Sequence, residues 1–397
     1  MAHESRTTSE IDIRAYRLAR VKAQLAERDL AGILLFDPIN IRYATGSRNM
    51  QVWTMHNICR YAFVATEGPV VLFDFSAALH LAANLETVDE CRPAKSWDYG
   101  AVGGRAEEIA SAWAEEIADL VRSHGGGNCR IALDRADLLP AQALTARGLT
   151  PEDGKAAMER ARAIKSATEI EAMRQALAVC AEAVAAMRAA VEPGARESDM
   201  LAILSRENIA RGGEYMETRL LTSGPRTNPW FQETADRVME DGDLLSFDTD
   251  LIGPGGFFTD ISRSWLVGDG RPSDEQRRLY DLARQQLEHN TALLKPGLGY
   301  LEMTEKAWNL PELYRPNRYA DIAHGAGLGV EYPLIYYPED AAGGAYDGVF
   351  EENMVVCVES YIGAVGGREG VKLEQPLLIT ESGVVSLCDY PFEEDYH

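Results

Sequence analysis

Three aspartates lie in an apolar segment of the chain, SFDTDLIGPGGFFTDISRSW, which spans residues 246–265. Asp248, Asp250 and Asp260 stand there among Leu, Ile and Phe, where an unpaired negative charge is costly. Residues two apart in a strand share a face, so we expect Asp248 and Asp250 to point the same way. The Gly-Pro-Gly-Gly turn would then return Asp260 beside them.

A second set of candidate ligands follows further along the chain. Glu359 lies in MVVCVES and Glu374 in VKLEQPLL, two stretches that read as buried strands. Between the two pairs of strands lies His324 in HGAGLG, where glycines let the backbone pass close to a bulky group. We expect these side chains to converge with the three aspartates.

Carboxylates that converge without Lys or Arg repel one another, which raises their pKa values. A pair of divalent cations removes this difficulty, and oxygen ligands with one imidazole suit manganese, iron, cobalt or zinc. Each acid alone could equally face water at the edge of a sheet. Five residues in the order Asp, Asp, His, Glu, Glu on two hairpins favour a metal site.

The elements that position these residues form the second of two expected domains. We predict an α+β domain over 156–397, with a helix that starts at a Ser166–Glu169 capping box and further helices at 198–211 and 274–293. Its hairpins pair 244–252 with 257–267 and 353–362 with 371–380. In front of it, residues 11–155 alternate strands and helices and predict an α/β domain.

Within this α/β domain we predict a helix after residue 11, a buried strand at 33–36, a turn at Asp37-Pro38, and two strands in RYAFVATEGPVVLFDF. A helix at 105–123 and a strand in CRIALDR follow. Residues 1–10 are polar and predict a disordered leader.

Composition excludes several classes of function. The chain has 397 residues and a net charge of −23, which argues against partners that need basic patches, such as nucleic acids and anionic membranes. No apolar run is long enough to span a bilayer. The six cysteines lie far apart with no CxxC pair, which argues against a disulfide framework or structural zinc and favours the cytoplasm.

The order Asp250, Asp260, His324, Glu359, Glu374 resembles the dimetal centre of the pita-bread enzymes, which include methionine aminopeptidase, aminopeptidase P, prolidase and, without metal, creatinase. TDISRSW is similar to the family's Ser-Asp-x-Thr-Arg segment, and HGAGLG is similar to its His-Gly-x-Gly. The resemblance implies a creatinase-like α/β N-terminal domain followed by a pita-bread catalytic domain.

Xaa-Pro peptidases of this family use two further histidines besides the ligand. Neither TSGPRTNPWFQE nor HGAGLGVEYP contains the additional histidine expected there. This difference weighs against peptide hydrolysis.

A different branch matches better, namely dimethylsulfoniopropionate lyases of the DddP type. FDPINIRYATGSRNMQVWTMHN and GGEYMETRLLTSGPRTNPWFQE look very like segments of that branch, which cleaves a sulfonium zwitterion into acrylate and dimethyl sulfide. The resemblance implies two divalent ions per chain, with iron as the metal and manganese, zinc or cobalt as alternatives. It also implies a homodimer in which the domain around Trp53 closes the neighbour's pocket. The implied metal ligands are Asp248, Asp250, Asp260, His324, Glu359 and Glu374.

One departure from the branch concerns the base. The lyases carry a catalytic Asp where this chain has Val330, and an apolar side chain cannot accept a proton. Glu331, Tyr319 or another acid would have to take the role. Metal coordination of the substrate carboxylate would acidify the neighbouring C–H, and an aromatic face would bind the sulfonium. Tyr319, Trp53 and Trp230 are the candidates for that face.

Two alternatives to the lyase remain open. The first is a dinuclear-metal hydrolase of a C–N bond, acting on an Xaa-Pro dipeptide or a small betaine-like amide, with Glu359 shuttling the proton. The second is a non-catalytic binding homologue. Arg219 and Arg226, in the shared ETRLLTSGPR run, could position a carboxylate, bridge the domains or serve an ordinary structural role.

Overall fold

The computed structural model describes residues 8–135 and 137–394, and this part of the chain forms two compact units that divide between Arg162 and Ala163. The division falls later than the predicted boundary after residue 155, because helix α7 (Lys155–Ala163) binds the first unit. The Tyr43 hydroxyl donates to the Ala161 carbonyl over 2.7 Å, and the Arg162 guanidinium donates to the Asn40 side chain. Most of the predicted leader lies outside the described residues, but Thr8 already begins helix α1.

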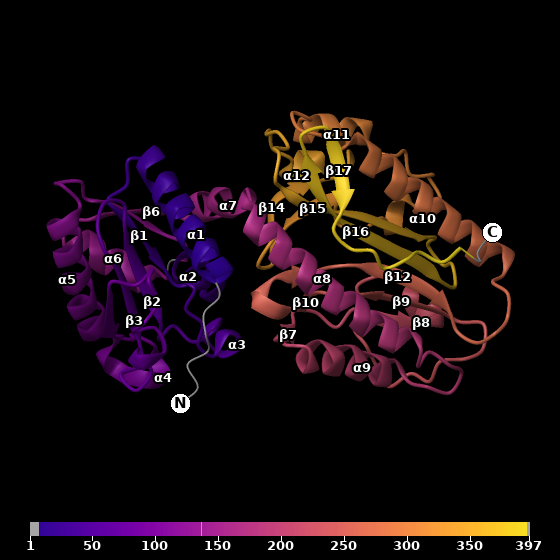
Figure 1. Ribbon diagram of the computed structural model, residues 1–397, viewed down its shortest axis with the longest axis horizontal. Coiled ribbons are helices and arrows are strands. Elements are labelled where there is room, and N and C mark those ends of the chain that lie inside the picture. Colours follow the sequence, from indigo (N-terminus) through magenta and orange to yellow (C-terminus); the bar gives the residue numbers. More distant parts are fainter. Residues whose placement is uncertain (1–7, 136, 395–397) are drawn as a thin grey trace. The chain divides into compact units, whose positions relative to one another are not determined.

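The first unit is the predicted α/β domain. Its sheet has six strands in the order β4-β3-β2-β1-β5-β6, with β1 antiparallel to β2 and parallel to β5. Helices lie on both faces of this sheet (Figure 1). The elements are α1 (Thr8–Glu27), β1 (Gly32–Leu35), α2 (Pro38–Thr45), α3 (Gln51–Thr54), β2 (Tyr61–Ala65), β3 (Val70–Asp74), β4 (Glu90–Pro93), α4 (Tyr99–Val102), α5 (Ala106–His124), β5 (Arg130–Leu133), α6 (Leu138–Ala146), β6 (Thr150–Asp153) and α7.

The turn predicted at Asp37-Pro38 is wrong, because these residues start helix α2. The Asp37 side chain accepts a hydrogen bond from the Ile39 N–H, and Pro38 occupies the first turn. An Asp cap followed by Pro at the first helical position is a strong start signal for a helix. The pair therefore begins an element where a simple turn was expected.

The second unit carries the predicted helices and hairpins. The capping box of Ser166 and Glu169 is confirmed at the start of α8, and α10 occupies the predicted range. The helices are α8 (Ala167–Arg188), α9 (Glu197–Ala210), α10 (Asp274–Leu293), α11 (Tyr300–Lys306) and α12 (Ala341–Gly344).

Three sheets complete this unit, in the orders β12-β9-β8, β11-β10-β7 and β14-β13-β15-β16-β17. The predicted hairpins are confirmed as the antiparallel pairs β9–β12, β10–β11 and β15–β16. The strands are β7 (Tyr215–Met216), β8 (Leu221–Ser223), β9 (Leu244–Asp248), β10 (Leu251–Ile252), β11 (Phe258–Thr259), β12 (Ser262–Leu266), β13 (Ala323–Ala326), β14 (Val330–Ile335), β15 (Val355–Gly363), β16 (Gly370–Thr380) and β17 (Gly383–Ser386).

Two features of the sequence can be checked directly against the described residues. All six cysteines lie in this part of the chain, and each of them is a free thiol. Among the helices described, none is long and apolar enough to cross a membrane.

Candidate metal centre

The first hairpin places its three aspartates where its strands are interrupted. β9 ends at Asp248 and β12 begins at Ser262, and these two residues face each other in the register. Asp250 lies between β9 and β10 with a φ of +40°, an uncommon conformation for a residue with a side chain. The carboxylates of Asp248, Asp250 and Asp260 nevertheless offer oxygens within 4.8 Å of one another. The expected convergence is correct, but a break in the strand produces it, not a shared strand face.

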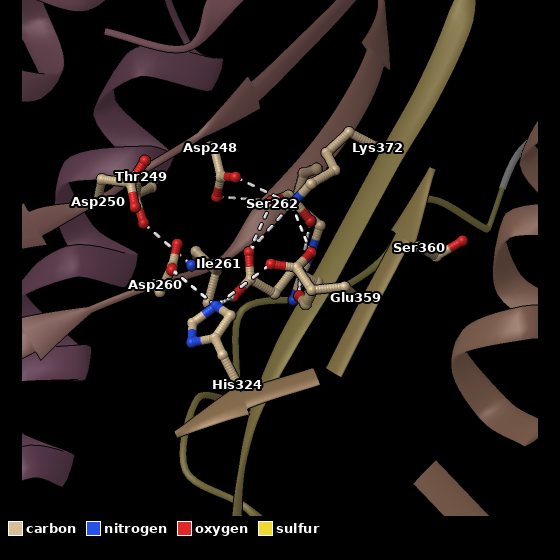
Figure 2. A network of polar contacts seen from close by, with 12 residues as sticks. Asp248, Thr249, Asp250, Asp260, Ile261, Ser262, His324, Glu359, Ser360 and Lys372 are labelled. Carbon is tan, nitrogen blue, oxygen red and sulfur yellow. Dashed lines mark hydrogen bonds and ion pairs between the residues drawn. The ribbon is translucent and has the colours of Figure 1, made fainter. Parts of the chain in front are cut away.

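The second set of ligands lies on the sheet formed by β13, β15 and β16. His324 pairs with Cys357 in the register, and Glu359 pairs with Glu374. Alternation along β15 sends Ser360 away from the cluster, as Figure 2 shows, where it donates to Gln286 over 2.8 Å. The two hairpins therefore face each other with their acids between them (Figure 2).

The ligand set around His324 has the dimensions of a metal site. From His324 Nε2, Glu359 Oε1 lies at 3.3 Å, Glu374 Oε1 at 3.6 Å and Asp260 Oδ2 at 3.7 Å. Ligands about 2.0–2.2 Å from a tetrahedral ion stand roughly 3.3–3.6 Å apart. The Nδ1 of His324 lies 3.1 Å from the Gly325 carbonyl, which leaves Nε2 free for an ion if Nδ1 carries the hydrogen.

Three oxygens of this set that do not face Lys372 lack a hydrogen-bond partner among the residues that the structure describes. They are the buried atoms Asp260 Oδ1, Glu359 Oε1 and Glu374 Oε1. Leaving buried oxygens unpaired is costly, and a cation would compensate for the cost. Asp260 belongs both to the group around His324 and to the group with Asp248 and Asp250, so the residues fit two neighbouring cations that share this ligand.

A lysine also lies inside the acidic cluster, which corrects the premise that the acids converge without Lys or Arg. Lys372 is fully buried, and its Nζ lies 2.6 Å from Glu359 Oε2, 2.9 Å from Asp248 Oδ2 and 3.2 Å from Glu374 Oε2. It also donates to the Ser262 hydroxyl over 2.7 Å. The Lys372 ammonium therefore supplies one positive charge of its own.

Each of the two glutamates has one carboxylate oxygen near Lys372 and the other near His324. In both Glu359 and Glu374 the Oε2 atom faces Lys372, whereas Oε1 faces the His324 ring. Asp248 is more fully engaged, because Oδ1 accepts from Ser262 over 2.8 Å and Oδ2 binds Lys372. One ammonium does not balance six ligands, five of them acidic, so the His324 side of the cluster still lacks a cation.

The pKa values of the cluster show the same excess of negative charge. Burial, followed by the nearby Glu374 and Asp248, raises the pKa of Asp260 well above its usual range. Burial, followed by Asp248, raises the pKa of Asp250 to about 8. Burial would also raise the pKa of Glu374, but Lys372 and His324 outweigh it and hold that pKa well below its usual range. Divalent cations would take the place of the protons that Asp250 and Asp260 hold.

The three aromatic candidates occupy different surroundings. Tyr319 borders the centre, with its ring centroid 4.5 Å from Lys372 Nζ and Phe231 stacked on it. Trp230 is 7% exposed and packs in the core beside Tyr361. Trp53 lies in the first unit on α3, 44% exposed, with its ring against Phe75. Of the two candidates in the second unit, Tyr319 lies nearer the acidic cluster, because the Trp230 ring centroid is 5.9 Å from Lys372 Nζ.

The two residues after the glycine-rich segment point in different directions. Glu331 is buried, where it accepts from the Leu328 N–H over 2.8 Å and pairs with Lys165 at 3.2 Å. Val330 is 54% exposed at the start of β14. A carboxylate already held by an ammonium is a weak base, so the geometry favours a supporting role for Glu331. Arg226 likewise binds within its own region, to Glu197 at 3.3 Å.

Several residues of the site were missed by sequence reasoning, although a signal was present. Lys372 precedes Glu374 by two positions and Cys357 precedes Glu359 by two, so each shares a strand face with a predicted ligand. The Cys357 thiol indeed lies within 4.8 Å of ligand atoms of Asp260, His324 and Glu374. Ser262, two positions after Asp260, could have been found in the same way.

The two facing hairpins together form a candidate metal centre. Residues 171–381 match the model of metallopeptidase family M24, and residues 17–176 match the creatinase/prolidase N-terminal domain. The chain therefore belongs to family M24 and has the predicted two-domain arrangement of its pita-bread enzymes.

Individual relatives refine this assignment. The chain is 43% identical over 386 residues to the dimethylsulfoniopropionate lyase DddP of Roseovarius nubinhibens, which covers 96% of this chain and 86% of the relative. Among solved structures, dipeptidase PepE from Mycobacterium ulcerans has a TM-score of 0.75 at 22% identity, with 98% of each chain covered. An Xaa-Pro dipeptidase from Bacillus anthracis has a TM-score of 0.75 at 19% identity, over 96% of this chain and 99% of that one. The two structures confirm the fold alone.

Proposed function

We propose that this protein is a metal-dependent carbon–sulfur lyase that cleaves dimethylsulfoniopropionate into acrylate and dimethyl sulfide. The observation that carries the proposal is the 43% identity to a dimethylsulfoniopropionate lyase across 96% of the chain. The ligand set around His324 supports it, because its interatomic distances fit a bound cation.

The chain's own residues define where the substrate would react. Divalent cations held by Asp248, Asp250, Asp260, His324, Glu359 and Glu374 would supply Lewis-acid polarisation of the substrate carboxylate. Lys372 keeps Glu359 and Glu374 oriented with one oxygen toward His324. A base removes the proton from the carbon next to the carboxylate, and the electron pair of that C–H bond forms the C=C bond of acrylate. The C–S bond breaks, and its electron pair leaves with sulfur as neutral dimethyl sulfide.

The base must be a group other than Val330. Burial, followed by the charge of Glu359, raises the pKa of Tyr319 well above its usual range, so its phenol stays protonated and suits hydrogen-bond donation. Asp321 is a second acid near the centre, buried, with Oδ1 lacking a hydrogen-bond partner among the described residues. Burial raises the pKa of Asp321 to about 6, a value suited to general-base catalysis near neutral pH. We assign proton removal to Asp321 in preference to Glu331.

The direct test compares two substrates with the metal-loaded protein. Headspace dimethyl sulfide is measured after addition of dimethylsulfoniopropionate, and free proline is measured after addition of Xaa-Pro dipeptides. We expect release of sulfide and no release of proline. Proline release without sulfide would overturn the lyase in favour of the C–N hydrolase, in which Glu359 would move the proton. Neither product from a metal-loaded protein would favour the binding homologue.

Three further features remain predictions that accompany the lyase. They are iron as the metal, with manganese, zinc or cobalt as alternatives, a homodimer, and a cytoplasmic location. Metal analysis of the protein as isolated tests the first, and its mass in solution tests the second.

A further inference from the structure

An exposed aromatic residue stands in a strained backbone conformation near the centre. Phe231 has a φ of +67°, and its side chain is 54% exposed. A bulky residue in the left-handed region is an outlier that persists only where its surroundings impose it. Such residues concentrate at binding and catalytic sites.

The segment around Phe231 is fixed by contacts on both sides. On one side, the Asn228 amide donates to the Ala364 and Gly367 carbonyls over 2.7 and 2.8 Å. On the other side, the Thr234 hydroxyl lies within hydrogen-bond distance of two carbonyls of the preceding segment, at 2.9 and 3.0 Å. These hydrogen bonds fix the segment on both sides of Phe231. The exposed position of the Phe231 side chain is therefore imposed by its surroundings.

The ring of Phe231 is connected to the acidic cluster through one side chain. It stacks on Tyr319 with centroids 5.2 Å apart and planes at 21°. Tyr319 in turn has the Lys372 ammonium 4.5 Å from its ring centroid. Since Lys372 binds Glu359 at 2.6 Å, Phe231 lies at the outer end of a short series of contacts that begins at the proposed metal ligands.

Tyr319 has little ring surface left for a further partner. It is 9% exposed, because Phe231 covers part of the ring and Lys372 occupies the centre. An ammonium already in contact with the ring would also repel a second cation. Phe231 offers the exposed aromatic surface, and no charged group of its own.

We propose that Phe231 is the cation-binding residue of the substrate site, which holds the onium end of a small zwitterion whose carboxylate faces the acidic centre. This inference rests on the proposed function and assigns the specificity for a positively charged sulfur to one residue. An onium group over an aromatic face is stabilised by the negative electrostatic potential of the ring.

The test uses two ligands of the same shape that differ in charge. 3-(Trimethylammonio)propanoate is the cationic probe, and 4,4-dimethylpentanoate replaces its nitrogen by carbon. Dissociation constants are measured by calorimetry on the metal-loaded protein, which needs no turnover. We expect the wild type to prefer the cationic probe by roughly 3- to 30-fold.

Phe231→Leu keeps an apolar side chain but removes the ring, and it should abolish this preference while the neutral probe binds as before. Phe231→Tyr should retain it. Tyr99→Leu, at an exposed aromatic of the first unit, serves as the matched control and should change neither constant. Equal loss of both probes in Phe231→Leu, or a wild type that does not prefer or does not bind the cationic probe, overturns the inference. Selective cation binding without sulfide release would instead leave it standing and reject the lyase reaction.

Discussion

At the scale of single residues, Lys372 determines how the acids coexist before a metal binds. Its ammonium contacts Asp248, Glu359 and Glu374 with no exposure to solvent. Removing one partner from a buried ion pair costs about 3–5 kcal/mol, since the other charge remains buried. The lysine therefore stabilises the metal-free protein. Without its ammonium, the charge of the buried carboxylates could be offset only by protonation.

We predict that Lys372→Met lowers the thermal midpoint of the metal-depleted protein by several degrees, and that added metal restores most of the loss. Lys372→Arg, which keeps the charge, should lose less. Differential scanning calorimetry with and without metal measures both effects. A metal-depleted Lys372→Met protein as stable as the wild type would show that the ammonium does not compensate for the acids.

Replacing Val330 distinguishes between the candidates for the base that removes the proton. It is 54% exposed at the start of β14, so an aspartate there should not disturb the fold. If this position provides the base in related lyases, Val330→Asp should raise dimethyl sulfide release by about 100-fold or more. Val330→Asn, of the same shape but without a base, is the control. An equal response of the two variants would leave proton removal with another acid, such as Asp321.

At the scale of elements, most strands and helices follow from sequence patterns, whereas the fine placement of the ligands does not. The Ser166–Glu169 capping box and the apolar periodicity behind it predict α8, and the glycine-rich turns predict the hairpins. The φ of +40° at Asp250 depends on pairing between β10 and its two neighbouring strands. No local pattern encodes that break, so the sequence could predict which acids meet but not how.

The stability of the first unit should depend on pH through Asp134, which connects the end of β5 to the start of α2. Asp134 follows β5 and accepts from the Phe36 N–H, the Asp37 N–H and the Asn40 amide over 2.8, 3.2 and 2.9 Å. Burial raises the pKa of Asp134 to about 7, against about 3.9 in the unfolded chain. The folded state thus holds this proton more tightly, and its contribution to stability falls as pH rises from about 4 to 7.

We therefore expect the stability difference between the wild type and Asp134→Asn to shift in favour of the variant as pH rises through that window. The slope is at most about 1.4 kcal/mol per pH unit. Thermal unfolding followed through the fluorescence of Trp97 and Trp113, which are buried in the same unit, measures it. Asp119→Asn, at an exposed position, is the control. A difference that stays constant between pH 4 and 7 would contradict the prediction.

At the scale of the whole molecule, the fold and the ligand types could be recognised from sequence, whereas the internal counter-ion was indicated only by its spacing from Glu374. The residues Asp250, Asp260, His324, Glu359 and Glu374 were sufficient to predict the family. The sequence places Lys372 in a buried strand, but only the pairing of β16 with β15 shows that its side chain is buried against the acids. The metal-centre hypothesis survives because the His324 side retains oxygens without a partner among the described residues.

The most direct test of the central claim is a calorimetric titration of the metal-depleted protein with manganese(II). We predict saturable binding of about two ions per chain, lost in Asp260→Ala because Asp260 belongs both to the group around His324 and to the group with Asp248 and Asp250. Glu381→Gln, at an exposed acid, should bind as the wild type does. A wild type that binds no metal, or an Asp260→Ala variant that binds it equally well, would contradict the account.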